Sequence, residues 1–214
     1  MSGVKCVFFA ATHRSGSTLL MEMIRKIDRI GRPGEYFYPQ NIADIQRRMG
    51  QKPDLAIESW LPAVIQQGSS PNGFFSAKIF AENFRWLSEQ LSGESWPQAK
   101  ASLPDFFREH FPSAKFVSLR RRDILKQGIS LHKALQTGIW HSNQADKVKA
   151  RQAYYQRDLI QWAMDNIRKQ EDDLASIFQM LGVEPLVFYY EDLIKDIPGS
   201  LEKVFELADT RLPD

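Results

Sequence analysis

The sequence predicts an α/β protein in which helices flank a central, mainly parallel sheet. Short apolar runs rich in β-branched and aromatic residues alternate with segments that have the apolar spacing of helices. A polar, P-loop-like turn joins the first apolar run to the first helix, and 214 residues at 43% hydrophobic content can bury the core of one domain. Because a parallel return needs a long connection, the alternation favours right-handed crossovers and a single domain over residues 1–214.

The first predicted elements are a strand, a polar loop and a helix. Residues 4–11 form a short apolar run typical of a buried strand, and residues 12–17 form the loop. Glycines and prolines at 31–39 favour a second loop, followed by short helices at 42–49 and 55–65. Apolar residues recur at helical spacing in the first helix: Leu19, Leu20, Met23, Ile24 and Ile27.

The second strand is predicted at residues 74–80, after the turn-forming residues 66–73. Lys78 lies near its carboxyl end. Residues 83–91 have the apolar spacing of a helix, and residues 92–102 read as a polar surface crossing.

A helix at residues 104–111 precedes the third strand, predicted at 114–119, which runs into the basic residues 120–122. Asp123 can cap the next helix, which we expect to extend to about Trp140. Ligands of such sheets gather at the carboxyl ends of the strands, so the basic residues are expected on the ligand-binding edge.

The last part of the chain predicts one long helix and a fourth strand. Residues 141–152 are polar and are expected to form a loop or lid. Residues 154–181 form a long amphipathic pattern stopped by Gly182, and residues 187–190 form the strand.

Composition excludes several classes of protein. The 28 basic and 26 acidic residues give a formal charge of +2, which offers no broad attraction for nucleic acid or an anionic membrane. Cys6 is the only cysteine, so an intramolecular disulfide is excluded and a thiolate-rich metal site is disfavoured. The early first strand leaves no room for a secretory signal, and no apolar run approaches the roughly 20 residues that span a bilayer. We therefore expect a cytoplasmic protein without a metal and without stable membrane insertion.

The loop at residues 13–18 has the composition of an anion site. Its backbone N–H groups and the positive end of the following helix can surround an anion, Gly16 permits close approach, and Arg14 suits phosphate or sulfate oxygens. A loop that binds nucleoside triphosphates would have lysine in place of Ser17 and glycine in place of Ala11. Their absence weakens the interpretation as a kinase-like protein that uses ATP and magnesium. An ordinary capped strand–helix turn is the alternative for the loop alone.

Several segments in order resemble the bacterial trehalose 2-sulfotransferase family of carbohydrate sulfotransferases, which use 3′-phosphoadenosine-5′-phosphosulfate (PAPS). The resemblance spans nearly the whole chain. It is carried by residues 14–20 (RSGSTLL), 31–37 (GRPGEYF), 76–78 (SAK), 121–130 and 135–140 (LQTGIW), and more loosely by 189–193 (YYEDL).

The resemblance implies a P-loop-like sulfotransferase fold and a donor site in two parts. Arg121 and Ser130 match the residues that bind the 3′-phosphate, whereas Arg122 has the arginine-to-serine spacing of other sulfotransferases, so both arginines are candidates. A solvated basic strand end is the alternative for this cluster. The first loop is implied to hold the 5′-phosphosulfate through Arg14, Ser15, Gly16, Ser17 and Thr18.

Two residues are the candidate catalytic groups. Glu35 matches the proposed catalytic glutamate of the family, and a carboxylate there could take the proton of an acceptor hydroxyl. Without the resemblance, a surface glutamate beside Gly34 would be the favoured interpretation. Lys78 could counter negative charge that develops during transfer, or it could extend from the sheet edge into water.

Glu22, Gln136 and Trp140 are the candidate acceptor-binding residues, because they combine hydrogen-bonding groups with a ring on which a sugar can stack. A solvated helix position for Glu22 and a core position for Trp140 are the alternatives. His132 and His141 are expected at the surface.

These residues predict a sulfotransferase that moves a sulfuryl group from PAPS to a hydroxyl of a carbohydrate or glycolipid. The alternatives are a kinase-like phosphotransferase and a module that binds 3′-phosphoadenosine-5′-phosphate (PAP) or another nucleotide without turnover. Aromatic stacking residues do not obviously accompany the basic residues 120–122, which disfavours a nucleic-acid adaptor. The chain departs from the family where His132-Lys133 replaces a tryptophan-arginine pair. Family members usually continue beyond the position of Asp214, so the resemblance leads us to expect a domain that lacks this C-terminal segment. The resemblance is compatible with a homodimer.

Overall fold

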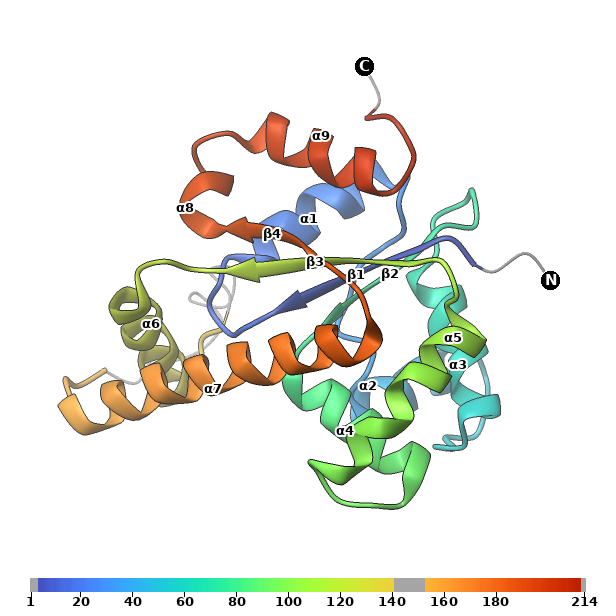
Figure 1. The fold of residues 1–214 in the computed structure, drawn as a ribbon, viewed down its shortest axis with the longest axis horizontal. Coiled ribbons are helices and arrows are strands. Elements are labelled where there is room, and N and C mark those ends of the chain that lie inside the picture. The colour runs from blue at the N-terminus through green and yellow to red at the C-terminus, as the bar shows by residue number, and fades with distance from the viewer. Residues whose placement is uncertain (1–3, 141–152, 213–214) are drawn as a thin grey trace.

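The computed structural model describes residues 4–140 and 153–212. Its centre is a four-stranded sheet in the order β2-β1-β3-β4, in which every neighbouring pair is parallel (Figure 1). The predicted α/β class with a parallel sheet is therefore confirmed. The strands are β1 (Cys6–Ala11), β2 (Phe75–Ile79), β3 (Ala114–Arg120) and β4 (Leu186–Tyr189).

Helices cover both faces of the sheet, as Figure 1 shows. On one face lie α1 (Ser17–Ile27), α8 (Tyr190–Leu193) and α9 (Ile197–Leu207). On the other lie α2 (Pro39–Arg48), α3 (Ile57–Gly68), α4 (Ala81–Ser92), the 3₁₀ helix η1 (Gln98–Ser102), α5 (Leu103–His110) and α7 (Arg157–Leu181). The helix α6 (Ile124–Thr137) packs against α7 beyond the carboxyl ends of the strands.

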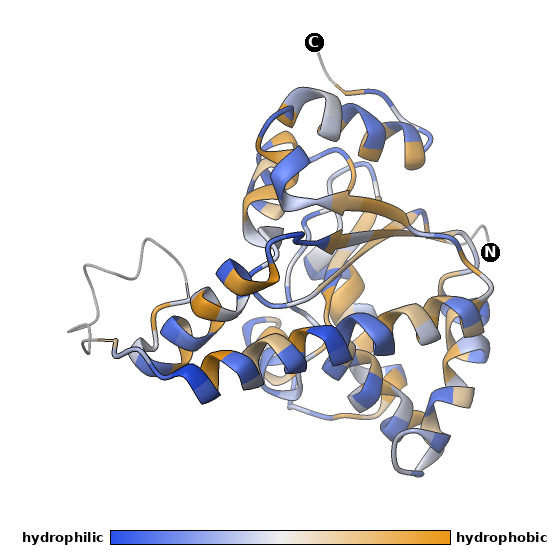
Figure 2. Ribbon diagram, turned by 60° about the vertical axis from the view of Figure 1, so that its left-hand side comes forward, coloured by the Kyte–Doolittle hydropathy of each residue, from blue (hydrophilic) through white to orange (hydrophobic). Residues whose placement is uncertain are grey.

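The two faces explain why the first strand is apolar at every position. Side chains alternate across a strand, so Val7 and Phe9 enter the core under α1 while Phe8 enters the core under α2–α5. Figure 2 shows the hydrophobic colour concentrated on the strands and on the helix faces turned toward them. The Phe8 ring alone lies 5.0 to 6.0 Å from five other rings, those of Phe37, Phe75, Phe107, Phe111 and Phe116.

The strand register brings the carboxyl ends of all four strands together at one end of the sheet. Ala10 pairs with Ile79 on one side and with Ser118 on the other, and Arg120 pairs with Tyr189. The residues that follow these strands therefore emerge side by side, at the edge where ligands of parallel sheets bind.

The structure corrects the predicted ends of several elements. The helix predicted to reach Trp140 ends at Thr137, because Gly138 takes a left-handed φ of 73° and its N–H caps the carbonyl of Ala134. The long helix begins at Arg157 rather than at residue 154. The polar crossing at 92–102 includes η1.

At the C-terminal end, the fourth strand closes at Tyr189, one residue early, because Tyr190 opens α8. Neither α8 nor α9 was predicted. The cap by Asp123 is confirmed, since its carboxylate accepts from the N–H of Lys126 at 2.9 Å. The loop or lid predicted at 141–152 lies outside the described residues. Within the described part of the chain, no helix has both the length and the hydropathy to cross a bilayer.

Candidate active site

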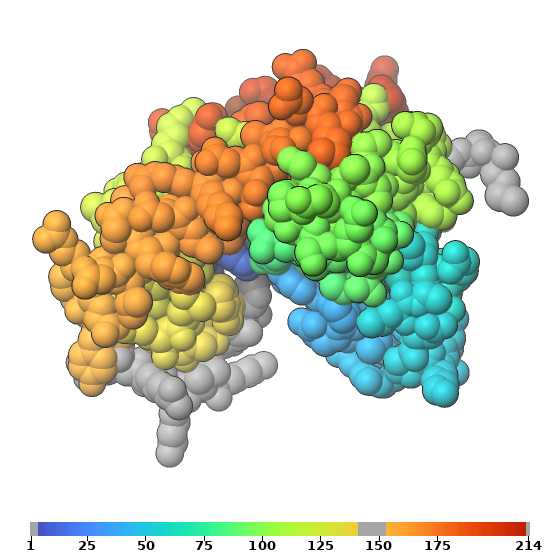
Figure 3. Space-filling model, turned by 60° about the horizontal axis from the view of Figure 1, so that its bottom comes forward, coloured from blue at the N-terminus to red at the C-terminus, as the bar shows by residue number. Residues whose placement is uncertain are grey.

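A cleft of about 830 Å³ opens at the edge where the carboxyl ends of the strands meet. Figure 3 shows the surface hollowed between α6 and the region of α2. Its walls come from the β1–α1 loop, the ends of β2 and β3, α6 and α8. The lining residues are His13, Arg14, Gly16, Ser17, Thr18, Leu19, Glu22, Glu35, Lys78, Phe80, Arg121, Ser130, Trp140 and Tyr190.

The β1–α1 loop turns sharply so that the first turn of α1 lines the cleft. Arg14 and Gly16 have left-handed φ values of 64° and 82°, and Gly16 is the N-cap of α1. A Cβ at Gly16 would lie 2.3 Å from Cδ2 of Tyr190. Position 16 therefore needs glycine both for its left-handed backbone and for its close packing against α8. Without a side chain there, the positive N-terminal end of α1 can face an anion.

The loop is tied to α6 through Arg14. Its Nε donates to Oγ of Ser130 at 2.9 Å, and its Nη1 donates to the carbonyl of Trp140. Burial, together with the neighbouring charge of Arg121, lowers the pKa of Arg14. The cleft thus holds two guanidinium groups whose positive charges repel each other. A bound anion would reduce this repulsion.

Two buried polar atoms at the cleft have no hydrogen-bond partner among the described residues. They are Nε of Arg121, which lines the cleft, and Oγ of Ser15, which is 0% exposed and is not among the lining residues. Arg121 stacks over the ring of Tyr190 at 4.8 Å, and its Nε lies 3.9 Å from the carboxylate of Glu191, beyond hydrogen-bond range. Buried donors of this kind are ordinarily satisfied, so Nε of Arg121 suits an oxygen of an anionic ligand.

Arg122 points away from this cleft. Its guanidinium binds both carboxylate oxygens of Asp192, at 2.8 and 2.5 Å, and lies 4.1 Å from the ring of Tyr189. The hydrogen bond to Asp192 raises the pKa of Arg122. Of the two candidate arginines, the structure brings only Arg121 into the cleft.

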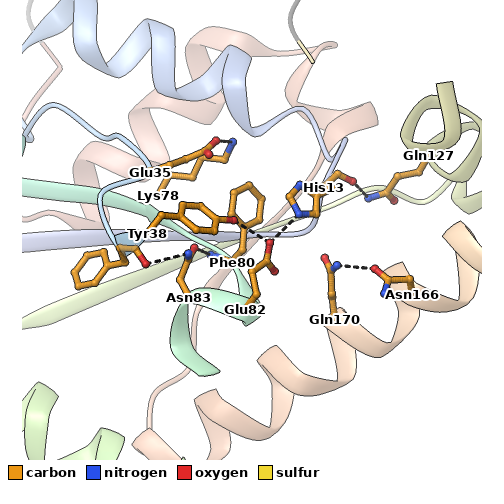
Figure 4. A network of polar contacts seen from close by, with 11 residues as sticks. His13, Glu35, Tyr38, Lys78, Phe80, Glu82, Asn83, Gln127, Asn166 and Gln170 are labelled. Carbon is orange, nitrogen blue, oxygen red and sulfur yellow. Dashed lines mark hydrogen bonds and ion pairs between the residues drawn. The ribbon is translucent and has the colours of Figure 1, made fainter. Parts of the chain in front are cut away.

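Glu35 and Lys78 meet within the cleft. Lys78 Nζ lies 2.8 Å from Oε1 of Glu35 and 4.6 Å from the centre of the Phe80 ring (Figure 4). The backbone holds the pair, because the N–H of Lys78 donates to the carbonyl of Gly34 at 2.9 Å. With 6% of its side chain exposed, Lys78 does not extend into water, so that alternative is wrong.

A second polar group stands beside this pair and includes residues that were not predicted. The carboxylate of Glu82 accepts from Nε2 of His13 at 2.8 Å and from the hydroxyl of Tyr38 at 2.9 Å (Figure 4). Burial raises the pKa of Glu82, but the hydrogen bonds from His13 and Tyr38 outweigh it and leave the pKa below its usual value. Burial and the Glu82 charge raise the pKa of Tyr38. The one sequence signal for this group was the position of His13 at the start of the loop at residues 13–18.

The candidate acceptor residues are only partly brought together. Glu22 and Trp140 line the cleft. Gln136 does not; its side chain bonds Gln156 at 2.8 Å and the N–H of Tyr154 at 2.9 Å.

His132 is buried rather than at the surface, and its Nε2 lies 3.1 Å from the carbonyl of Tyr154. This contact ties α6 to the residues before α7. His141 lies outside the described residues. Across residues 4–140 and 153–212, no three His, Cys, Asp or Glu side chains gather as metal ligands would.

The chain is similar to two mycobacterial proteins named trehalose 2-sulfotransferase. It is 26% identical to the one from Mycobacterium tuberculosis over 220 residues and 27% identical to the one from Mycolicibacterium smegmatis over 218 residues. Each alignment covers 92% of this chain and 81% of the relative. The model of the Stf0 sulphotransferase family matches residues 7–208, nearly the whole chain, and the protein therefore belongs to that family.

Proposed function

We propose that this protein transfers a sulfuryl group from PAPS to a hydroxyl of a carbohydrate or glycolipid. The observation that carries the proposal is one cleft in which a loop rich in anion-binding groups adjoins the Glu35–Lys78 ion pair. Membership of a sulphotransferase family and similarity to two trehalose 2-sulfotransferases support it.

The donor would be held by both anion-binding parts of the cleft. When bound, PAPS supplies a sulfuryl group activated by a phosphate leaving group. Arg121 and Ser130 would bind the 3′-phosphate, and the unpartnered Nε of Arg121 fits a ligand rich in acceptor oxygens. The 5′-end would be held by Arg14, Ser15, Gly16, Ser17 and Thr18. We propose that Arg122 stabilises the turn after β3 through Asp192 instead.

Glu35 would accept a proton during the transfer, and Lys78 would stabilise the negative charge that develops. The acceptor oxygen forms a new S–O ester bond as the bond between sulfur and the phosphate oxygen breaks, and its proton passes to the carboxylate of Glu35. Lys78, buried and positively charged beside Glu35, counters the negative charge that remains on the leaving oxygen.

The acceptor would enter on the side of Glu22 and Trp140. Both residues line the cleft, and they offer a carboxylate for hydroxyl groups and a ring for a sugar face. Trehalose is the first acceptor to test, because both relatives carry it in their names. Gln136 is not part of this proposal, since its amide groups are engaged outside the cleft.

The test is a transfer assay with PAPS and a panel of sugars that begins with trehalose, with the sulfate ester detected by mass spectrometry. Glu35→Gln keeps the size of the side chain and removes the base, so kcat should fall by about 100-fold or more. Binding of PAP, measured by calorimetry, should be unchanged.

Glu58→Gln, an exposed change on α3, is the matched control and should leave turnover unaltered. Undiminished turnover by Glu35→Gln would remove Glu35 from its assigned role. Wild-type protein that neither binds PAP nor sulfates any acceptor would contradict the proposed function itself.

A further inference from the structure

His13 forms part of the cleft wall between the Lys78 side and the Trp140 side. Its ring stacks on Phe80 with centroids 4.4 Å apart and planes at 22°, and it lies 5.8 Å from the ring of Trp140. Lys78, the partner of Glu35, lies over the same Phe80 ring. His13 and Lys78 therefore contact the same Phe80 ring, which places His13 near the proposed base in the cleft that Ser130 and Arg121 also line.

Contacts to the backbone, to one ring face and to Nε2 fix the position of the His13 imidazole. Gln127 donates to its backbone carbonyl at 2.8 Å, Phe80 covers one ring face, and Glu82 fixes Nε2 at 2.8 Å (Figure 4). Glu82 is fixed in turn by the hydroxyl of Tyr38. Because an ionised carboxylate can only accept, Nε2 must carry the hydrogen, and the orientation of the ring follows.

One polar atom of this ring remains for a ligand. Among the described residues, Nδ1 of His13 has no hydrogen-bond partner, and 25% of the side chain is exposed in a residue that lines the cleft. With hydrogen on Nε2, a neutral imidazole accepts at Nδ1, and a protonated one donates there. A hydroxyl group can pair with Nδ1 in either state, because it both donates and accepts.

We propose that His13 is an acceptor-binding residue that hydrogen-bonds a sugar hydroxyl through Nδ1, and that Glu82 is the positioning residue that sets its ring. The inference rests on the proposed sulfuryl transfer. It adds a specificity contact near the base Glu35, carried by two residues that the sequence had not assigned to the acceptor.

The first test compares His13→Phe with wild type in the transfer assay with trehalose. Phenylalanine keeps the stacking on Phe80 and removes both ring nitrogens. A lost hydrogen bond to a neutral hydroxyl should raise the KM for trehalose about 3- to 10-fold. The kcat and the Kd for PAP should stay unchanged. His110→Phe, which alters a histidine on α5 away from the cleft, is the matched control.

Two further variants separate binding from a structural role. His13→Gln offers an amide N–H to Glu82 and an amide oxygen to the sugar, so it should restore most of the affinity for trehalose. Glu82→Gln should raise the KM in the same direction as His13→Phe. The two changes should be non-additive in the double variant, because both act through one contact.

Monodeoxy trehaloses identify the contact directly. If His13 binds one hydroxyl, His13→Phe should leave the KM unchanged for the analogue that lacks that hydroxyl and should raise it for the others. An unchanged KM for trehalose in His13→Phe would overturn the inference, as would an equal loss of PAP affinity, which would place His13 on the donor side. Wild-type protein that neither binds PAP nor transfers sulfate would overturn the proposed function and this inference together.

Discussion

Lys78 and Glu35 form an ion pair that connects the end of β2 to the loop before α2. The pair is 2.8 Å long, and Lys78 is almost fully buried beside Phe80. A buried cation is costly unless it is paired, and Glu35 supplies the partner of Lys78 within the cleft.

Replacing Lys78 with methionine tests its assigned role. Methionine keeps the apolar stem and removes the charge that would face the leaving oxygen. We expect kcat to fall about 100- to 1,000-fold, the scale of losing one electrostatic contact to a transition state. PAP affinity should change far less.

Lys115→Met, an exposed change at the other end of the sheet, is the control for this experiment. A kcat equal to that of wild type in Lys78→Met would show that the ammonium does not act on the reaction.

At the residue scale, the sequence predicted the types of group in the cleft better than their partners. Arg14, Gly16, Ser17, Thr18 and Glu35 line it, because a strand-to-helix turn and a nearby loop fix their positions along the chain, whereas Ser15 is buried and does not line it. The choice between Arg121 and Arg122 depended on Asp192, about 70 residues away, which engages only one of them. The orientation of the His13 ring depends in the same way on Glu82, 69 residues away.

The β1–α1 loop and α8 form one packed unit at the scale of elements. Gly16 has a φ of 82°, and its Cα faces the ring of Tyr190, over which Arg121 stacks. The anion loop and the arginine of the other anion-binding part therefore share one aromatic support.

Gly16→Ala tests this packing, and Gly50→Ala is its matched control. Gly50 has a similar φ of 72° but no atom near the position of a Cβ. Each change should cost about 1–2 kcal/mol for the left-handed backbone. Gly16→Ala should cost more and should also weaken PAP binding, because its Cβ would collide with Tyr190.

Chemical denaturation and PAP titration measure both effects. Equal losses of unfolding free energy in the two variants, with PAP affinity intact, would show that Tyr190 does not constrain the loop.

The structure confirmed the helices and strands that a long apolar pattern predicted. Their ends shifted where a single residue, such as a glycine, stops the element. Gly138 ends α6 three residues early, a helix stop that the apolar pattern up to Trp140 obscured. The four-residue helix α8 is too short for any periodicity, so it could not be predicted from spacing.

At the scale of the whole molecule, β1 is one of the two central strands of the sheet. It pairs with both β2 and β3, and Cys6 on it is the only cysteine of the chain. The alternation of strands and helices was enough to predict the parallel sheet. The strand order was not predicted, because it depends on how the helices pack into separate cores on the two faces of the sheet. Burial raises the pKa of the Cys6 thiol to about 12.

Cys6 should therefore react with a thiol reagent only when the sheet opens. We expect labelling of the native protein to follow global unfolding and to accelerate with denaturant. If PAP binds the folded state alone, a concentration of about 100 times its Kd should slow labelling about 100-fold. Rapid, complete labelling of the native protein would contradict the burial of β1.

The central claim is that this cleft binds a 3′-phosphorylated nucleotide through Arg121, and calorimetry with PAP tests it most directly. Wild-type protein should bind PAP without magnesium and in preference to ATP. Arg121→Ala should weaken PAP binding about 10- to 100-fold, as expected for a hydrogen bond to a charged group. Arg122→Ala should bind PAP as wild type does, because that guanidinium is engaged by Asp192. Loss of PAP binding in Arg122→Ala but not in Arg121→Ala, or wild-type protein that prefers ATP with magnesium, would contradict the account.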